Sequence, residues 1–118
     1  MFKRINQEIF QSYLVNFRTV PLFDKQFKKL SKKYTLIKDD MQELIINFED
    51  LHLQSTSIKT NLYKIRLANS NKNKGKRAGY RIYYYIRIEE TVHFLTIYDK
   101  SEIEKIDETV LINLIKNI

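Results

Sequence analysis

The chain has 118 residues, of which 43% are hydrophobic and 13% aromatic, a composition typical of a folded domain and not of a disordered segment. This length suits one domain, so we expect a single domain over residues 1–118, with residues 1–11 as a possible N-terminal extension. The absence of cysteine excludes disulfides and thiolate metal ligands, and is typical of the cytoplasm. No apolar run approaches the roughly 20 residues of a membrane span. We therefore expect a cytoplasmic protein without membrane contact.

The net charge of +7 comes from one part of the sequence. Residues 51–88 contain nine lysines and arginines and no carboxylate, whereas the rest holds 12 basic residues (21 − 9) and 14 acidic ones. A localised excess of cations is typical of proteins that bind a polyanion. Tyrosines alternate with these cations, and single-stranded RNA recognition uses aromatic rings beside cations. The alternative is a solvent-exposed strand pair whose charges prevent edge-to-edge association.

The first half of the chain predicts one strand and two helices. Residues 13–20 are rich in aromatic and branched residues and predict a strand, whereas residues 1–11 fit either a short helix or a frayed end. Pro21 suits the first position of a helix, and apolar residues continue at helical spacing to Tyr34. The same spacing predicts a second helix from Ile37 to Leu51. Because the link between the two helices is very short, we expect an antiparallel helical hairpin.

The second half predicts mainly strands. Residues 62–68 and 80–88 alternate between apolar and polar residues, and residues 91–98 are apolar enough to lie in the middle of a sheet. Between them we expect a lysine-rich loop at residues 69–79 and a hairpin loop at Glu89-Glu90. Residues 111–118 predict a short C-terminal amphipathic helix. The expected fold is α+β: an N-terminal helical hairpin on one face of a twisted, mainly antiparallel sheet, with a short C-terminal helix.

The alternation also predicts which side chains share a face of the sheet. The apolar set is expected to pack against the helical hairpin, and consists of Tyr63, Ile65, Leu67, Ile82, Tyr84 and Ile86. The opposite face is expected to present a basic and aromatic set as a platform for a substrate, and this set consists of Lys64, Arg66, Arg81, Tyr83, Tyr85 and Arg87.

Four ordered segments of this chain resemble the RelE/ParE superfamily of type II toxins, above all its RelE/HigB-like branch. The segments are YKIRL at 63–67, NKNKGK at 71–76, GYR at 79–81 and LTIYDKSE at 95–102. The sequence FRTVP at 17–21 is also similar to the strand that enters the family's helical hairpin. The resemblance covers about residues 13–118. It departs from the family pattern at Asn73, where the family has a glycine, and at Arg77-Ala78, where it has two small residues.

The resemblance implies a RelE-like fold of the microbial ribonuclease type and a toxin that cuts mRNA, usually in the ribosomal A site, and so inhibits translation. It implies no cofactor and no metal. The implied partners are the mRNA, the ribosome and a cognate antitoxin that is acidic or carries a helix-turn-helix domain. Two alternatives stay open. One is a ParE-like toxin of the same fold that targets DNA gyrase, although ParE-like members lack the basic catalytic cluster that this chain keeps. The other is a non-catalytic RNA-binding or regulatory module.

The resemblance also assigns candidate site residues. Metal-free cleavage needs a deprotonated 2′-hydroxyl, a stabilised phosphorane and a protonated leaving oxygen. A lysine among other cations has a lowered pKa, and arginine binds phosphate oxygens while staying charged. The catalytic candidates are Lys64, Arg66 and Arg81, with Tyr98 and Lys100 at the end of the last strand. The candidates for RNA binding are Lys72, Lys74, Lys76, Arg77, Tyr83, Tyr85 and Arg87. His52 and His93 lie outside the catalytic motif positions and are expected to be structural.

Overall fold

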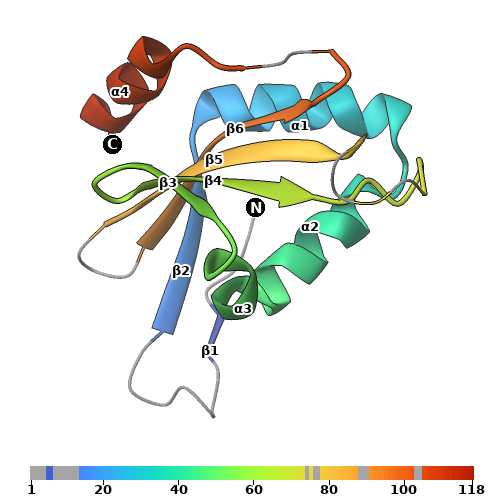
Figure 1. Cartoon of the computed structure of the whole chain (residues 1–118), viewed down its shortest axis with the longest axis horizontal. Coiled ribbons are helices and arrows are strands. Elements are labelled where there is room, and N and C mark those ends of the chain that lie inside the picture. The colour runs from blue at the N-terminus through green and yellow to red at the C-terminus, as the bar shows by residue number, and fades with distance from the viewer. Residues whose placement is uncertain (1–4, 7–13, 74, 76–77, 88–90, 103–104) are drawn as a thin grey trace.

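The computed structural model describes residues 5–6, 14–73, 75, 78–87, 91–102 and 105–118. In chain order the elements are β1 (Ile5–Asn6), β2 (Leu14–Thr19), α1 (Pro21–Lys33), α2 (Ile37–Ile46), α3 (Phe48–His52), β3 (Thr56–Lys59), β4 (Leu62–Leu67), β5 (Tyr80–Ile86), β6 (Thr91–Asp99) and α4 (Glu108–Lys116), as Figure 1 shows. The strands form one sheet in the order β1-β2-β6-β5-β4-β3. The pair of β2 and β6 is parallel, and the other neighbouring pairs are antiparallel. The expected α+β class and the mainly antiparallel sheet are thus confirmed.

Helix α1 begins at Pro21, as predicted, because proline lacks the N–H that a first helical residue cannot use. Its buried residues Phe23, Phe27 and Leu30 recur every three or four positions and so lie on one side of the helix. The ring of Phe23 stacks on that of Phe94 in β6, with centroids 5.6 Å apart. Helix α1 therefore packs on β6 through its apolar side.

Helix α1 also covers the part of the β6 edge that β2 does not pair with. Strand β2 pairs only with residues 91–94 of β6, which leaves the second half of that strand without its partner on this side. The side chain of Gln26 in α1 accepts a hydrogen bond from the backbone N–H of Ile97, at 2.9 Å. One side chain of the helix thus satisfies a backbone donor that no strand reaches.

The prediction of one continuous helix from Ile37 to Leu51 is wrong, because this segment forms two helices. Helix α2 ends at Ile46 and α3 begins at Phe48, with Asn47 between them at φ −103° and ψ 24°. The side-chain amide of Asn47 donates to the backbone oxygen of Glu43 at 3.1 Å, and such local hydrogen bonds compete with helix continuation. The predicted stripe is nevertheless buried at Ile37, Met41, Leu44, Ile45 and Phe48.

Two strands were missed by the sequence analysis. Strand β3 is polar, and only its Ile58 is apolar, so the strand has no alternation to detect. It forms because it pairs with β4, with Thr56 opposite Lys64. The turn between the two strands contains Asn61, whose φ is 64°. Strand β1 pairs with β2, so the helical alternative for residues 1–11 is wrong at Ile5 and Asn6.

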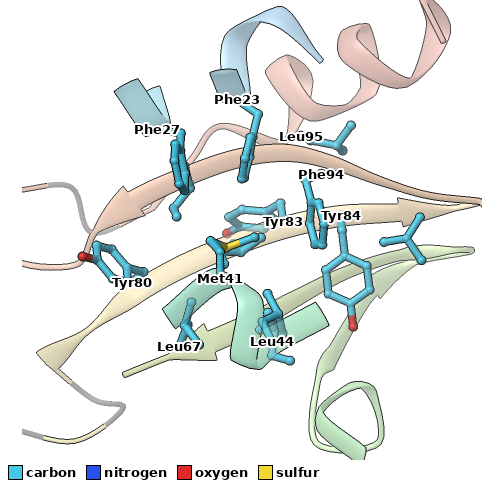
Figure 2. Close-up of a cluster of buried hydrophobic side chains, with 14 of the residues drawn as sticks. Phe23, Phe27, Met41, Leu44, Leu67, Tyr80, Tyr83, Tyr84, Phe94 and Leu95 are labelled. Atoms are coloured by element: carbon cyan, nitrogen blue, oxygen red, sulfur yellow. The ribbon is translucent and has the colours of Figure 1, made fainter. Parts of the chain in front are cut away.

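The core lies between the sheet and the first two helices. Figure 2 shows Phe23 and Phe27 from α1, and Met41 and Leu44 from α2, around the central strands. The predicted apolar face of the sheet is confirmed: Ile65, Leu67, Ile82 and Tyr84 are buried, and Tyr63 and Ile86 are partly buried. The Tyr84 hydroxyl lies 2.6 Å from Nδ1 of His52, which gives this histidine the structural role expected of it.

Helix α4 packs on the other face of the sheet. The register between β5 and β6 shifts between Tyr83 and Tyr84, so that Leu95 has no direct partner on β5. Leu95 is buried and points toward α4 (Figure 2), and Leu111 is the buried residue of the helix. Lys59 at the end of β3 forms an ion pair with Glu108 at 2.7 Å. This ion pair connects the start of α4 with the edge strand β3.

Candidate nucleic-acid interface

Arg66, Arg81 and Tyr98 form a row across three neighbouring strands. Arg66 lies opposite Arg81 in the register of β4 and β5, and Arg81 lies opposite Tyr98 in that of β5 and β6. Lys64 and Tyr83 form the next pair along the same face. Cβ atoms of directly opposite residues stand about 5 Å apart. These five residues are called the basic face below, and their register agrees with the predicted alternation.

The basic face is not the open platform that the sequence suggested, and this expectation is corrected. Arg81 is 4% exposed, Tyr98 3% and Tyr83 2%. The ring of Tyr83 stacks on that of Tyr98 with centroids 6.3 Å apart, and the ammonium of Lys64 lies 5.8 Å from its centroid. Because its ring is engaged and buried in this way, Tyr83 is packed within the protein and does not offer a free face to a base.

The chain after β6 returns to the side of the sheet on which the basic face lies. Helix α4 lies on the same side of the sheet as the basic face, and its start is fixed to Lys59 by Glu108. Lys105, just before α4, lies close enough to Lys64 to lower the pKa of that lysine. An alternating strand shows which residues share a face, but it does not show that a segment distant in sequence covers that face.

A hollow of about 460 Å³ opens beside the row at the edge of β4. Strand β3 begins at Thr56, opposite Lys64, so the later part of β4 has no strand on this side within the described residues. The hollow is lined by Leu51, Gln54, Thr56, Lys64, Ile65 and Arg66. The first three of these residues were missed, because no sequence signal predicted β3 or the position of the α3 end beside β4.

The neighbouring cations of the basic face lower the pKa of Lys64 and of Arg81. Burial lowers the pKa of Lys64, and the neighbouring charges of Arg81, Arg66 and Lys105 lower it further. Burial, followed by the charge of Arg66, also lowers the pKa of Arg81. Burial and the adjacent Tyr83 raise the pKa of Tyr98, which therefore stays a neutral phenol at neutral pH. Lys64 is thus a lysine whose neutral form is favoured by its surroundings.

Lys72, predicted to contact RNA, belongs to a partly buried polar cluster around Asp99. Its ammonium lies 2.8 Å from Oδ1 of Asp99 and donates to the backbone oxygen of Ala78 at 3.2 Å. Burial alone would raise the pKa of Asp99, but hydrogen bonds from Lys72, Tyr34 and Ser101 outweigh it and hold this pKa well below the usual range. The ammonium of Lys72 thus pairs with the carboxylate of Asp99 within the protein.

The remaining candidates are dispersed. Lys100 is exposed and lines a separate hollow of about 430 Å³ with Lys72, Ala78 and Ser101. Tyr85 is half-buried near the far end of β5, and Arg87 is exposed just beyond it. Lys74, Lys76 and Arg77 lie outside the described residues. The structure therefore brings together Lys64, Arg66, Arg81 and Tyr98, but not the whole predicted set.

Asn73 has a backbone conformation that suits asparagine. Asn73 has a φ of 52°, in the left-handed region that glycine adopts most easily and asparagine tolerates better than most residues. The loop is held on one side by Asp40 of α2, which accepts hydrogen bonds from the backbone and the hydroxyl of Ser70. Asparagine thus occupies a position at which its own backbone preference fits.

No protein-family model and no curated protein matches this chain. The fold and site define an α+β protein with a mixed sheet, one face of which carries a row of cations beside a hollow. None of the helices in the described ranges is both long and apolar enough to cross a membrane.

Proposed function

We propose that this protein is the toxin of a type II toxin–antitoxin pair and acts in the cytoplasm as a metal-independent mRNA endonuclease, with the ribosome presenting the substrate. The observation that carries the proposal is the row of Arg66, Arg81 and Tyr98 with Lys64 beside it at the hollow. The resemblance of four sequence segments to RelE/HigB-like toxins supports it. In this reading α1 and α2 correspond to the family's helical hairpin and the whole chain to its RelE-like fold.

The proposed reaction begins at Lys64. Its neutral amine removes the proton of a 2′-hydroxyl, and the 2′-oxygen attacks the adjacent phosphorus. The bond between phosphorus and the 5′-oxygen breaks, and this oxygen takes a proton from solvent water. Tyr98 is 3% exposed and lies beyond Arg81 as seen from the hollow, so it does not reach the leaving oxygen. The products are a 2′,3′-cyclic phosphate and a 5′-hydroxyl. Arg66 lines the hollow and is suited to hold the phosphate oxygens as negative charge develops on them.

Arg81 has a different role in this mechanism. Because it is 4% exposed and lies behind Arg66, it is assigned as a positioning residue that acts on Lys64 through its charge. By lowering the pKa of Lys64, it increases the fraction of neutral amine near neutral pH. Removing its charge should therefore raise that pKa and move the rise of the cleavage rate with pH toward higher pH.

The first experiment is induction in a bacterial host. We expect growth arrest, loss of translation and new mRNA 5′ ends inside codons by primer extension. Lys64→Ala should abolish these ends without loss of ribosome binding, and cleavage should persist in EDTA under conditions where the ribosome stays intact. Lys38→Ala, an exposed lysine on α2, is the matched control and should cleave normally. Growth arrest with intact mRNA and a damaged chromosome would instead identify a ParE-like toxin that targets gyrase.

One observation favours the non-catalytic RNA-binding alternative: Arg81 and Tyr98 are almost completely buried. The discriminating pair is Arg81→Gln and Arg87→Gln. For a nuclease, the first change should reduce cleavage and shift the pH–rate profile, whereas the second should affect only binding. For a simple RNA-binding module, both changes should give graded losses of affinity and no cleavage should be detected in the unmodified protein.

We also propose that the partner is a cognate antitoxin that is acidic or carries a helix-turn-helix domain. The net charge of +7 supports an acidic partner, because opposite charges accelerate association. The rate constant of association should therefore fall as the salt concentration increases. The simplest check is the reading frame adjacent to this gene: if it encodes neither an acidic nor a helix-turn-helix protein, the assignment as a toxin loses its main prediction.

A further inference from the structure

The outer side of α1 consists of lysines. Lys25, Lys28, Lys29 and Lys32 are all exposed. Each lies three or four residues from two of the others, which places them on one stripe of the helix. These four residues are called the lysine face below. The opposite side of α1 carries the buried residues that pack on the sheet, so the lysine face points away from the core.

The sequence-wide charge count did not reveal this face. Outside residues 51–88 the acids outnumber the bases, but the acids of this part are mostly on other elements. The single carboxylate of α1, Asp24, lies in its first turn and has one buried carboxylate oxygen. Among the residues that the structure describes, none of the four lysines pairs with a carboxylate. The lysine face is therefore a second cationic surface, on a different element from Lys64 and Arg66.

Like charges three or four residues apart destabilise a helix. The lysine face contains four such pairs: 25–28, 25–29, 28–32 and 29–32. Lysines close to the C-terminus of a helix interact favourably with its dipole, but this effect is confined to the last turn and so does not explain Lys25 or Lys28. An arrangement that costs stability and has no partner within the described protein points to a partner outside it.

A hollow adjoins the lysine face at the C-terminal end of α1. Its volume is about 250 Å³, and Lys29, Lys32 and Lys33 line it together with Leu30 and Glu102. Lys33 is held on one side of this hollow by its ion pair with Glu102 at 3.3 Å. Lys29 and Lys32 thus belong both to the exposed stripe and to a concave site that suits an anionic group.

The composition of the face indicates the kind of anion. Protein–protein interfaces are enriched in aromatic residues, methionine and arginine and depleted in lysine, and none of the enriched types occurs among the four outward residues. Phosphate groups of a nucleic-acid backbone, in contrast, are bound by lysines as simple point charges. A duplex presents them in a regular array, which suits a rigid helix whose outer face carries cations along about 10 Å, at 1.5 Å per residue.

We propose that the lysine face of α1 binds the phosphate backbone of a nucleic-acid duplex, as a docking surface separate from the hollow beside Lys64. The contact is electrostatic and independent of sequence. It does not require cleavage by the protein, so it stands or falls separately from the proposed nuclease activity.

The test measures how the affinity for a duplex depends on salt, using a Lys64→Ala background in which the proposed cleavage is absent. The probes are a fluorescent RNA duplex and a DNA duplex of the same sequence, followed by anisotropy between 50 and 300 mM salt. Each phosphate contact contributes about 0.9 to the slope of log K against log salt concentration. Replacing all four lysines by glutamine should therefore reduce the slope by about 3 to 4, and the duplex that the parent binds more tightly identifies the natural source of the backbone.

The matched control removes the same charge elsewhere. Lys28→Gln/Lys32→Gln should reduce the slope by about 2, whereas Lys38→Gln/Lys116→Gln, which removes two exposed lysines from α2 and α4, should leave it nearly unchanged. Thermal unfolding should show that the quadruple variant is folded and at least as stable as the parent, since like-charge pairs have been removed. Equal slopes in parent and quadruple variant with both duplexes would overturn the proposal. Equal decreases of the slope in the two double variants would also overturn it. So would a quadruple variant that no longer binds polyglutamate but still binds the duplexes as the parent does.

Discussion

Arg66 on β4 and Arg81 on β5 lie directly opposite each other in an antiparallel register. Like charges in this position destabilise a strand pair by roughly 0.2–1 kcal/mol. The free-energy cost is greater for Arg81, because this residue is buried. Burial and the charge of Arg66 both lower its pKa. A pair that opposes folding in this way is typical of a site where charge is needed for binding or catalysis.

The first prediction follows from this pair. Arg66→Gln should raise the free energy of unfolding by a few tenths of a kcal/mol, up to about 1 kcal/mol, because it removes the repulsion from an exposed side chain. The same variant should lose RNA cleavage. Urea unfolding and a cleavage assay on one protein sample measure both effects. Lys38→Gln, which changes an exposed lysine on α2, should alter neither, and a destabilised Arg66→Gln would contradict the repulsion argued here.

The second prediction concerns the ion pair of Lys72 and Asp99. Asp99 is 1% exposed, so Lys72→Met would leave a buried carboxylate without its main partner. We expect the free energy of unfolding to fall by roughly 3 kcal/mol. Lys100→Met, an exposed lysine in the adjacent turn, should change it by less than about 0.5 kcal/mol. Urea denaturation followed by circular dichroism separates the two outcomes, and similar values for both variants would show that Lys72 is not structural.

The third prediction concerns pH. Burial lowers the pKa of His52, and burial together with Arg87 and Arg18 lowers that of His93. Between these folded values and the ordinary 6.5, the unfolded chain binds more protons, so the free energy of unfolding must decrease as pH falls below about 6.5. Asp99, whose pKa is held low, should lose its contribution only below about pH 4.

Thermal unfolding between pH 8 and pH 4.5 checks this prediction. The melting temperature should fall between pH 6.5 and pH 5. His52→Gln/His93→Gln should flatten that fall, although its melting temperature at pH 7.5 should be lower than that of the parent. A melting temperature of the parent that rises on acidification to pH 5 would mean that the histidine pKa values are shifted in the other direction.

The fourth prediction compares the two glycines. A Cβ on Gly79 would lie 2.1 Å from the backbone oxygen of Leu67, whereas one on Gly75 would meet nothing within 4 Å. Gly79→Ala should therefore reduce the free energy of unfolding by about 3 kcal/mol or more, since backbone atoms must move. Gly75→Ala should cost only about 1–2 kcal/mol, from its φ of 77°. Chemical denaturation measures both, and comparable costs would indicate that the Gly79 backbone can adjust.

The sequence was informative where a local pattern is tied to burial. The helical stripe of α1 and the alternation of β4 and β5 correctly predicted the burial of Phe23, Phe27, Leu30, Ile65, Leu67, Ile82 and Tyr84. Each pattern arises because one side of an element faces away from water. The alternation did not predict the burial of Leu62 and Tyr83. Strand β3 was missed because it is polar and owes its existence to hydrogen bonds with β4 rather than to a buried face. The single long helix was wrong at Asn47, whose side chain competes for a backbone oxygen.

The sequence by itself determined that Lys64, Arg66 and Arg81 share one face, because side chains two residues apart in a strand point the same way. Only the tertiary structure decided which of them is accessible. It placed Lys105, in the segment before α4, near Lys64, paired Lys72 with Asp99, and left Lys64 and Arg66 at the hollow. Burial and charge pairing depend on segments that are distant in sequence, and no local pattern of residues records which of them meet.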